Sequence, residues 1–373
     1  MKINIVGDFK CNDVSKISFD TDLLTILHEG DVNIVNFEAP IKNSNSKKTL
    51  KSGPCLSQSQ QSAAFLEQNG FNLVCLANNH VMDYGEDALE NTMACFKKAT
   101  TMGAGTWEEA YRIKSFEVEH KRVGFLALTQ HEFGVLAEKT GNEKCIGSAW
   151  MLHPMVDELI LKGKKENDFL FLLPHAGIEN QYQPLPELRT LYKHWINMGA
   201  DGVIASHPHT PQGWETYNGK PIVYSLGNFS FENHSAKLPP YWFYGLIANI
   251  EINEEKIKLD IQGLHFDMNT GLISITKEDS FCSHLTAINK VLQDEPQYLK
   301  EVERYCKELM PVYDRAFAES GYVKYNSKKY VKLLLRKLFH RQRPTSVMHL
   351  MNNLRCEVHR WTIVRAIENW GII

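Results

Sequence analysis

The stretch LVCLANNH, residues 73–80, joins a short apolar run to three polar side chains. An apolar run of this length is typical of a buried β-strand, and the polar residues come where such a strand would end. The same arrangement occurs four more times in the first 275 residues. The five apolar runs are residues 3–6, 32–35, 73–77, 169–173 and 203–205. Their alternation with turns and helical stretches predicts an α/β fold.

Potential metal ligands follow all five runs. They are Asp8, Glu38, Asn79, His175, His207 and His209. Side chains at the carboxyl ends of separate strands converge on one crevice in open α/β sheets, so we expect these six residues to lie close together. A single Asp or His after a strand is more often a cap or a turn residue, but that interpretation does not explain six of them.

The segments between the runs predict helices and further strands. Helical spacing of apolar residues marks residues 59–69, 84–102, 148–162 and 185–198. Period-two patterns in residues 112–128 and 221–275 predict antiparallel strands. The polar segment 43–62 predicts an exposed loop. Long helical patterns begin near residue 277, so we divide the chain into an α/β domain, residues 1–276, and a helical C-terminal region, residues 277–373.

The composition allows a sizeable core and excludes some partners. The chain has 373 residues, of which 43% are hydrophobic, enough for one large domain and a smaller one. Its 41 basic and 44 acidic residues give a net charge of -3, so no nucleic-acid partner is expected. Eight cysteines without a CxxC pair favour buried reduced thiols over disulfides.

Membrane and export signals are weak in this sequence. The opening MKINIVGDFK is too short for a signal-peptide core, and no apolar stretch is long enough to span a membrane. We therefore expect a cytoplasmic protein. One segment adds a possible peripheral membrane contact, since a basic amphipathic helix over residues 322–343 would suit an anionic membrane surface or an acidic polymer. The alternative is a helix packed on the protein with a solvated basic face.

The six potential ligands have the composition of a site for one or two divalent metal ions. Mn, Fe and Zn favour mixed carboxylate and imidazole ligands, and a carboxylate can bridge two ions. His207 and His209 are two residues apart, so on an extended segment both side chains would point to the same side. Two such ions can polarise an ester and stabilise the negative charge that develops during its hydrolysis.

Six motifs that contain these residues occur in a specific order. They are Gly7-Asp8, Asn36-Phe37-Glu38-Ala39-Pro40, Ala77-Asn78-Asn79-His80 with Asp83 and Gly85, His175-Ala176-Gly177-Ile178-Glu179, His207-Pro208-His209, and Tyr224-Ser225-Leu226-Gly227-Asn228-Phe229. This order resembles that of calcineurin-like metallophosphoesterases and, more closely, of the CapA family of capsule-synthesis proteins. The resemblance covers about residues 1–275. It implies a four-layer α-β-β-α sandwich and a role in the synthesis of a capsule or another anionic polymer, such as poly-γ-glutamate or a polysaccharide.

The resemblance also implies a role for each site residue. Asp8 and His209 would bind one ion, Asn79, His175 and His207 the other, and Glu38 would lie between the two ions. His80 would donate a proton to the leaving group, and Asp83 and Glu179 are candidates to orient the imidazoles. The chain departs from the family pattern at two positions. Lys10 stands where many phosphoesterases have a histidine, and Ala176 stands where CapA proteins usually have a tryptophan.

Three further motifs each allow two interpretations. His131-Glu132 either extends the site or forms an ordinary loop. The turn at Gly227-Asn228 either shapes the floor of a pocket or is purely structural. The cluster Trp242-Phe243-Tyr244 is either a substrate platform or part of the core.

Two hypotheses about function remain open at this point. The first is a divalent-metal hydrolase that acts on a phosphoester or an amide, with an anionic polymer or a phosphoester as substrate and other polymer-synthesis proteins as partners. The second is a non-catalytic assembly or binding component that keeps the fold without turnover. Lys10 favours the second hypothesis, because a lysine in place of a histidine removes a ligand.

Overall fold

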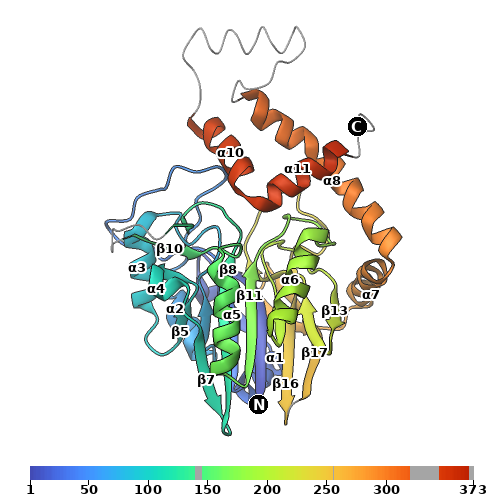
Figure 1. Cartoon of the computed structure of the whole chain (residues 1–373). Coiled ribbons are helices and arrows are strands. Elements are labelled where there is room, and N and C mark those ends of the chain that lie inside the picture. Colours follow the sequence, from blue (N-terminus) through green and yellow to red (C-terminus); the bar gives the residue numbers. More distant parts are fainter. Residues whose placement is uncertain (139–144, 255, 320–343, 369–373) are drawn as a thin grey trace.

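Two β-sheets packed face to face form the centre of the fold (Figure 1). The structure is a computed structural model that describes residues 1–138, 145–254, 256–319 and 344–368. In the larger sheet the strand order is β2-β18-β17-β16-β1-β3-β4-β5, and β15 also pairs with β1. The bounds are β1 (Lys2–Lys10), β2 (Ser18–Phe19), β3 (Val32–Phe37), β4 (Leu73–Cys75), β5 (Thr100–Met102), β15 (Asn228–Phe231), β16 (Tyr244–Asn253), β17 (Lys256–Asp267) and β18 (Leu272–Thr276). Strands β1, β3, β4 and β5 run parallel, whereas β16, β17 and β18 extend the sheet in antiparallel fashion.

The smaller sheet has the order β13-β14-β12-β11-β8-β7. Its bounds are β7 (Lys114–Val118), β8 (Lys121–Thr129), β11 (Phe169–His175), β12 (Gly202–Ile204), β13 (Trp214–Tyr217) and β14 (Lys220–Val223). The four inner strands are parallel, and β7 and β13 are antiparallel edges. A third sheet of three short strands contains β6 (Ala104–Thr106), β9 (Val135–Leu136) and β10 (Ile146–Ala149).

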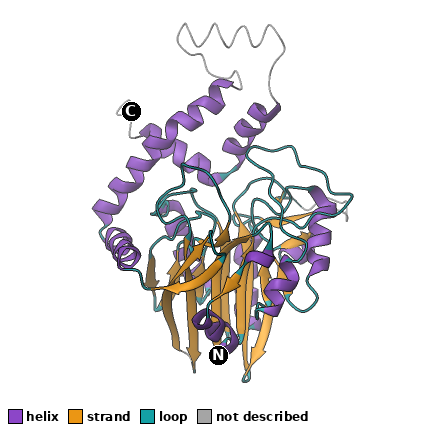
Figure 2. Ribbon diagram, turned by 180° about the vertical axis from the view of Figure 1, so that it is seen from behind, coloured by secondary structure: helices purple, strands orange, loops and turns teal. Residues whose placement is uncertain are grey.

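Three buried hydrophobic clusters separate four layers of secondary structure. Residues such as Ile5, Ile34, Phe125 and Phe171 fill the space between the two large sheets. The outer face of the larger sheet packs against α1 (Thr21–Glu29), α2 (Ser62–Gln68) and α3 (Gly85–Cys95), and that of the smaller sheet packs against α5 (Met155–Glu166) and α6 (Pro186–Met198). The short helices are Val14–Lys16 and α4 (Trp107–Ala110). The predicted four-layer α-β-β-α sandwich is therefore confirmed (Figure 2).

Two of the four predicted helical ranges were too long. In the range 84–102 the helix ends at Cys95, and Thr100–Met102 form a strand that pairs with β4. In the range 148–162 the first residues belong to β10, and the helix begins only at Met155. In both cases a few residues beside the helix satisfy their backbone groups in a sheet, and local periodicity does not reveal that pairing.

The C-terminal helices begin beside β13 and continue across the end of the sheets opposite to the N-terminus (Figure 1). They are α7 (Asp279–Gln293), α8 (Glu295–Glu319), α10 (Pro344–Arg355) and α11 (Glu357–Glu368). Tyr305 of α8 and Val358 of α11 belong to the same buried cluster as Leu172 of β11 and Trp195 of α6. The described helices thus pack on the sandwich, and the division of the chain into two domains stays a prediction.

The proposed basic membrane-binding helix, residues 322–343, lies outside the described residues. Within the part of the chain that the structure describes, no helix is both long enough and apolar enough to cross a membrane.

A polar cluster around Glu215 connects α6 and α8 to the smaller sheet. Arg189 Nε donates to Glu215 Oε1 at 2.9 Å, and Arg189 Nη1 donates to Glu295 at 2.8 Å. The Tyr224 hydroxyl also donates to Glu215, and the guanidinium of Arg189 lies over the ring of Tyr298. Burial raises the pKa of Glu215, but the hydrogen bonds from Arg189 and Tyr224 outweigh it and lower the pKa below its ordinary value of 4.5.

We expect Glu215→Gln to reduce the free energy of unfolding by about 1–3 kcal/mol at neutral pH, because Arg189 loses its charged partner. Since the pKa of Glu215 is lower in the folded protein, its carboxylate stabilises the fold fully above pH 4.5, and the contribution is lost as the pH falls through the folded-state pKa. Urea unfolding at several pH values measures the difference between variant and wild type, which should shrink in acid. The exposed Glu117→Gln is the control. A difference that persists unchanged at about pH 3 would contradict this account.

Candidate metal centre

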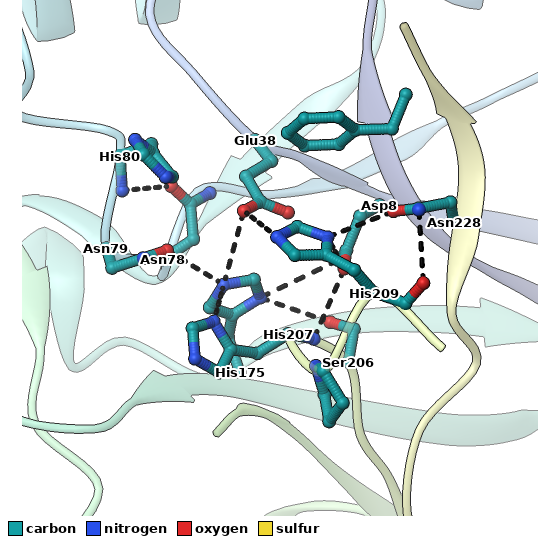
Figure 3. A network of polar contacts seen from close by, with 12 residues as sticks. Asp8, Glu38, Asn78, Asn79, His80, His175, Ser206, His207, His209 and Asn228 are labelled. Atoms are coloured by element: carbon teal, nitrogen blue, oxygen red, sulfur yellow. Dashed lines mark hydrogen bonds and ion pairs between the residues drawn. The ribbon is translucent and has the colours of Figure 1, made fainter. Parts of the chain in front are cut away.

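The six predicted ligands lie together at the carboxyl ends of strands from both large sheets (Figure 3). Asp8 lies in β1, Glu38 directly follows β3, and His175 is the last residue of β11. The other three belong to the loops that follow β4 and β12. All six side chains are buried. The strand ends that the sequence places in one repeating pattern therefore come from two sheets and meet at one site.

Potential ligand atoms form two groups of three within the site. In each group the atoms lie within 4.8 Å of one another; the groups are Asp8, Glu38 and His209, and Glu38, His175 and His207. Asn79 Oδ1 lies 3.1 Å from His175 Nε2, which places it beside the second group. Glu38 belongs to both groups. The residues are thus divided into the same two groups that the resemblance implies. The binding of metal ions to these groups stays a prediction.

Glu38 holds a position that suits a cation. Its Oε1 lies 3.5 Å from His209 Nε2 and 3.8 Å from His175 Nε2. Among the described residues this buried oxygen has no hydrogen-bond partner. A buried carboxylate oxygen without a donor is unfavourable, and a divalent ion would relieve that cost. The donor set of carboxylate, imidazole and amide oxygens fits Mn, Fe or Zn.

The charges of the site groups depend on one another. Burial raises the pKa of Asp8, but the hydrogen bond to His209 and the charges of His175 and His209 lower it to about 2. Burial lowers the pKa of His209, but Glu38 and Asp8 raise it to about 10. Burial and the charge of Asp8 raise the pKa of Glu38 well above its usual range. Burial lowers the pKa of His175 and of His207, so both are neutral and offer lone pairs to an ion.

The segment that carries His207 and His209 is not extended. The backbone φ angle is +105° at His207 and +58° at His209, values that residues other than glycine rarely adopt. The prediction that strand alternation aligns these two imidazoles is therefore wrong. Two local bends direct them into the site instead, at a cost of about 1–3 kcal/mol each. The His207 amide donates to Asp8 Oδ2 at 3.3 Å, which helps to hold the bend.

Two asparagines that we did not predict as site residues orient the ligands. Asn36 Nδ2 donates to Asp8 Oδ1 at 2.7 Å and lies 3.2 Å from His175 Nδ1. Asn228 Oδ1 lies 3.0 Å from His209 Nδ1. The turn at Gly227-Asn228 thus contacts a predicted ligand. Both asparagines lie inside the ordered motifs, which was the signal that could have identified them.

Gly7 allows β1 to approach this turn closely. The Asp8 amide donates to the carbonyl oxygen of Gly227 at 3.0 Å, and a Cβ atom on Gly7 would lie 1.9 Å from that oxygen. A side chain at position 7 would push the turn away. The glycine before Asp8 therefore fixes the distance between Asp8 and Asn228.

His80 lies beside the ligand groups and contacts a carboxylate. Its Nδ1 lies 2.6 Å from Asp83 Oδ2 and 3.2 Å from Lys51 Nζ, and Lys51 forms an ion pair with Asp83. Lys51 is buried, so the prediction of an exposed loop over residues 43–62 is wrong at this position. The ion pair with Asp83, which is distant in the sequence, makes the burial of the Lys51 charge possible. No local sequence pattern predicts this pairing.

Comparison with known proteins identifies the family. The family model described as "Bacterial capsule synthesis protein PGA_cap" matches residues 8–233, more than half of the chain. The chain belongs to this family. The match includes all six predicted ligands as well as His80, Asp83 and Glu179. The resemblance to CapA proteins is therefore confirmed.

Two curated relatives are similar to this chain over about half of its length. The "Capsule biosynthesis protein CapA" of Bacillus anthracis is 31% identical over 206 residues, which are 53% of this chain and 49% of that protein. The "PGA biosynthesis protein CapA" of Bacillus subtilis (strain 168) is 30% identical over 204 residues, 53% of this chain and 52% of that protein. The chain thus spans about half the length of these relatives. A solved structure of a hypothetical protein from Thermus thermophilus aligns with a TM-score of 0.45 and 13% identity, covering 71% of this chain and 99% of that one.

A pocket of about 330 Å³ opens beside the second ligand group of this family member. Asn79, His80 and His207 line one side, and α8, α10 and α11 contribute residues such as Tyr313 and Asn352 to the other. The helices that follow the sandwich therefore form part of the pocket wall.

Glu179 also lines this pocket. Among the described residues it makes no hydrogen bond to a ligand imidazole, and its predicted orienting role stays a prediction. Of the pair His131-Glu132, Glu132 lines the pocket, whereas the ring of His131 packs against Trp150.

Two other sequence motifs are found at the edge of the site. Trp242 is buried, and its ring centroid lies 5.1 Å from that of His209, so it supports a ligand from within the core. Lys10 is buried, and its Nζ donates to Asn12 at 2.7 Å. In the described part of the chain no ion pair joins Lys10 to Asp8 or Glu38.

Proposed function

We propose that this chain is a divalent-metal hydrolase that cleaves a phosphoester or an amide bond during the synthesis or processing of an anionic surface polymer. The observation that carries the proposal is the buried carboxylate of Glu38, which two groups of potential ligands share. The polymer context is supported by the family and by its relatives, whose printed names refer to capsule and PGA biosynthesis.

The residues present fit two ions. Asp8, Glu38 and His209 would hold one, and Glu38, His175 and His207, with the amide oxygen of Asn79, would hold the other. Bound divalent ions supply Lewis acidity and lower the pKa of a coordinated water. Neutral His175 and His207 are ready to bind an ion, whereas His209 must first lose the proton that Asp8 and Glu38 stabilise.

His80 is the residue that would move a proton during the reaction. Asp83 contacts its Nδ1, which fixes the ring and leaves Nε2 as the nitrogen for the leaving group. His80 also lines the pocket, where a substrate would lie. Lys51 lies in the same pocket wall, where its ion pair with Asp83 holds it beside His80.

Lys10 supports the rival hypothesis of a binding or assembly component without turnover. It occupies the position where many phosphoesterases have a histidine ligand, and its amino group bonds to Asn12. With one nitrogen ligand fewer, the group around Asp8 would hold its ion more weakly.

One assay separates the two hypotheses. Full-length protein treated with a chelator is reloaded with Mn or Zn and assayed for bound metal and for hydrolysis of a generic phosphodiester and of poly-γ-glutamate. We expect metal-dependent turnover of at least one substrate, lost in His209→Ala and retained in the exposed control His28→Ala. Bound metal without turnover of either substrate would favour the rival, and a chain that binds no metal would contradict the hydrolase.

A further inference from the structure

Glu132, Cys356 and His359 form a third group of potential metal ligands outside the proposed hydrolytic centre. Their ligand atoms lie within 4.8 Å of one another, although the residues are far apart in the sequence. Glu132 lies in the loop after β8, Cys356 lies between α10 and α11, and His359 lies in α11. The group therefore forms where the C-terminal helices meet the sandwich. Only Glu132 lies inside the residues that the family model matches.

Polar neighbours orient two members of this group. Gln130 Nε2 donates to Glu132 Oε1 at 2.7 Å. The hydroxyl of Tyr313 lies 2.9 Å from His359 Nδ1, which leaves Nε2 as the nitrogen for a ligand. Imidazoles and carboxylates that bind metals usually have such outer partners, because the partners fix the ring or carboxylate in one direction. The thiol of Cys356 is buried, as is common for a structural cysteine ligand.

We propose that Glu132, Cys356 and His359 bind a zinc ion that fastens the C-terminal helices over the pocket. A thiolate, an imidazole and a carboxylate together suit Zn, whereas a thiolate is a poor ligand for Mg, Ca or Mn. Binding would displace the proton of the Cys356 thiol into solvent and form a zinc–sulfur bond. Three protein ligands leave a fourth position for water or substrate.

The site is connected to the proposed hydrolytic centre. Glu132 and His359 line the same pocket as His80 and His207. Gln130 Nε2, which donates to Glu132, also lies 3.0 Å from His207 Nε2. An ion at Glu132 would thus hold α11 against the pocket.

Cobalt substitution tests the site directly in the full-length chain. Co²⁺ bound to a thiolate has a charge-transfer absorption in the near ultraviolet, and Co²⁺ bound only to oxygen and nitrogen lacks it. We expect this absorption in the wild type and its loss in Cys356→Ser, together with one equivalent of bound zinc. Cys306→Ser is the matched control, because Cys306 is equally buried in the same hydrophobic cluster and belongs to none of the ligand groups found in the described residues.

Two further variants distinguish loss of the zinc site from misfolding and from effects at the hydrolytic centre. His359→Gln keeps the thiol and should weaken cobalt binding roughly 10- to 100-fold or more. Glu38→Gln should leave the thiolate absorption intact, even where hydrolysis is lost. If Co²⁺ binds the wild type without a thiolate absorption, or if the absorption remains in Cys356→Ser, the proposed zinc site is contradicted. The proposed hydrolytic function would be unaffected by that result.

Discussion

Glu38→Gln is expected to remove both ions of the proposed hydrolytic centre and to lower kcat/KM by more than the roughly 100-fold that loss of an outer partner can cost. Glu38 is the residue that the two ligand groups share, so one substitution changes both. A glutamine has nearly the same shape but offers no negative charge to bridge two cations. Metal content by mass spectrometry and hydrolysis of the active substrate measure the effect.

The stability of the same variant distinguishes lost metal binding from misfolding. Burial and the charge of Asp8 raise the pKa of Glu38, so the ionised carboxylate is disfavoured at this position in the protein without ions. After treatment with a chelator, Glu38→Gln should therefore melt at the same temperature as the wild type or higher. The exposed Glu90→Gln in α3 is the control for a carboxyl-to-amide change. Retention of as much metal in Glu38→Gln as in the wild type would rule out the shared-ligand arrangement.

His80→Ala is expected to lower kcat by about 10²- to 10⁴-fold while both ions remain bound, because His80 belongs to neither ligand group. The loss should be largest for an ester with an alkoxide leaving group, which needs a proton. It should be much smaller for a nitrophenolate leaving group, which departs without one. Rates for the two esters and metal content measured on the same preparations test this role.

The exposed His234→Ala serves as the control for His80→Ala and should resemble the wild type with both esters. An equal loss of rate for the two leaving groups would show that His80 positions the substrate instead of donating a proton. Loss of a metal ion from His80→Ala would place His80 among the ligands.

Much of the fold and of the candidate site is encoded locally in the sequence. Each predicted ligand comes within four residues after an apolar run that becomes a buried strand, as for His175 at the end of β11. A run of buried apolar residues indicates a buried strand. The polar residue after the run marks the carboxyl end of that strand. The order of six motifs then identifies the family, which the match to residues 8–233 confirms.

Only the tertiary structure decided how the site is completed. The sequence predicts that His207 and His209 align on a strand, whereas left-handed backbone angles held by contacts with Asp8 and Asn228 direct them. Lys51 is buried because Asp83, on a separate segment, compensates its charge. Glu132 meets Cys356 and His359 only because the C-terminal helices pack across the ends of the strands. Local periodicity indicates which residues face the core. It does not indicate which distant side chains form ion pairs, fix backbone bends or cover the site, since those contacts form only after the layers have packed.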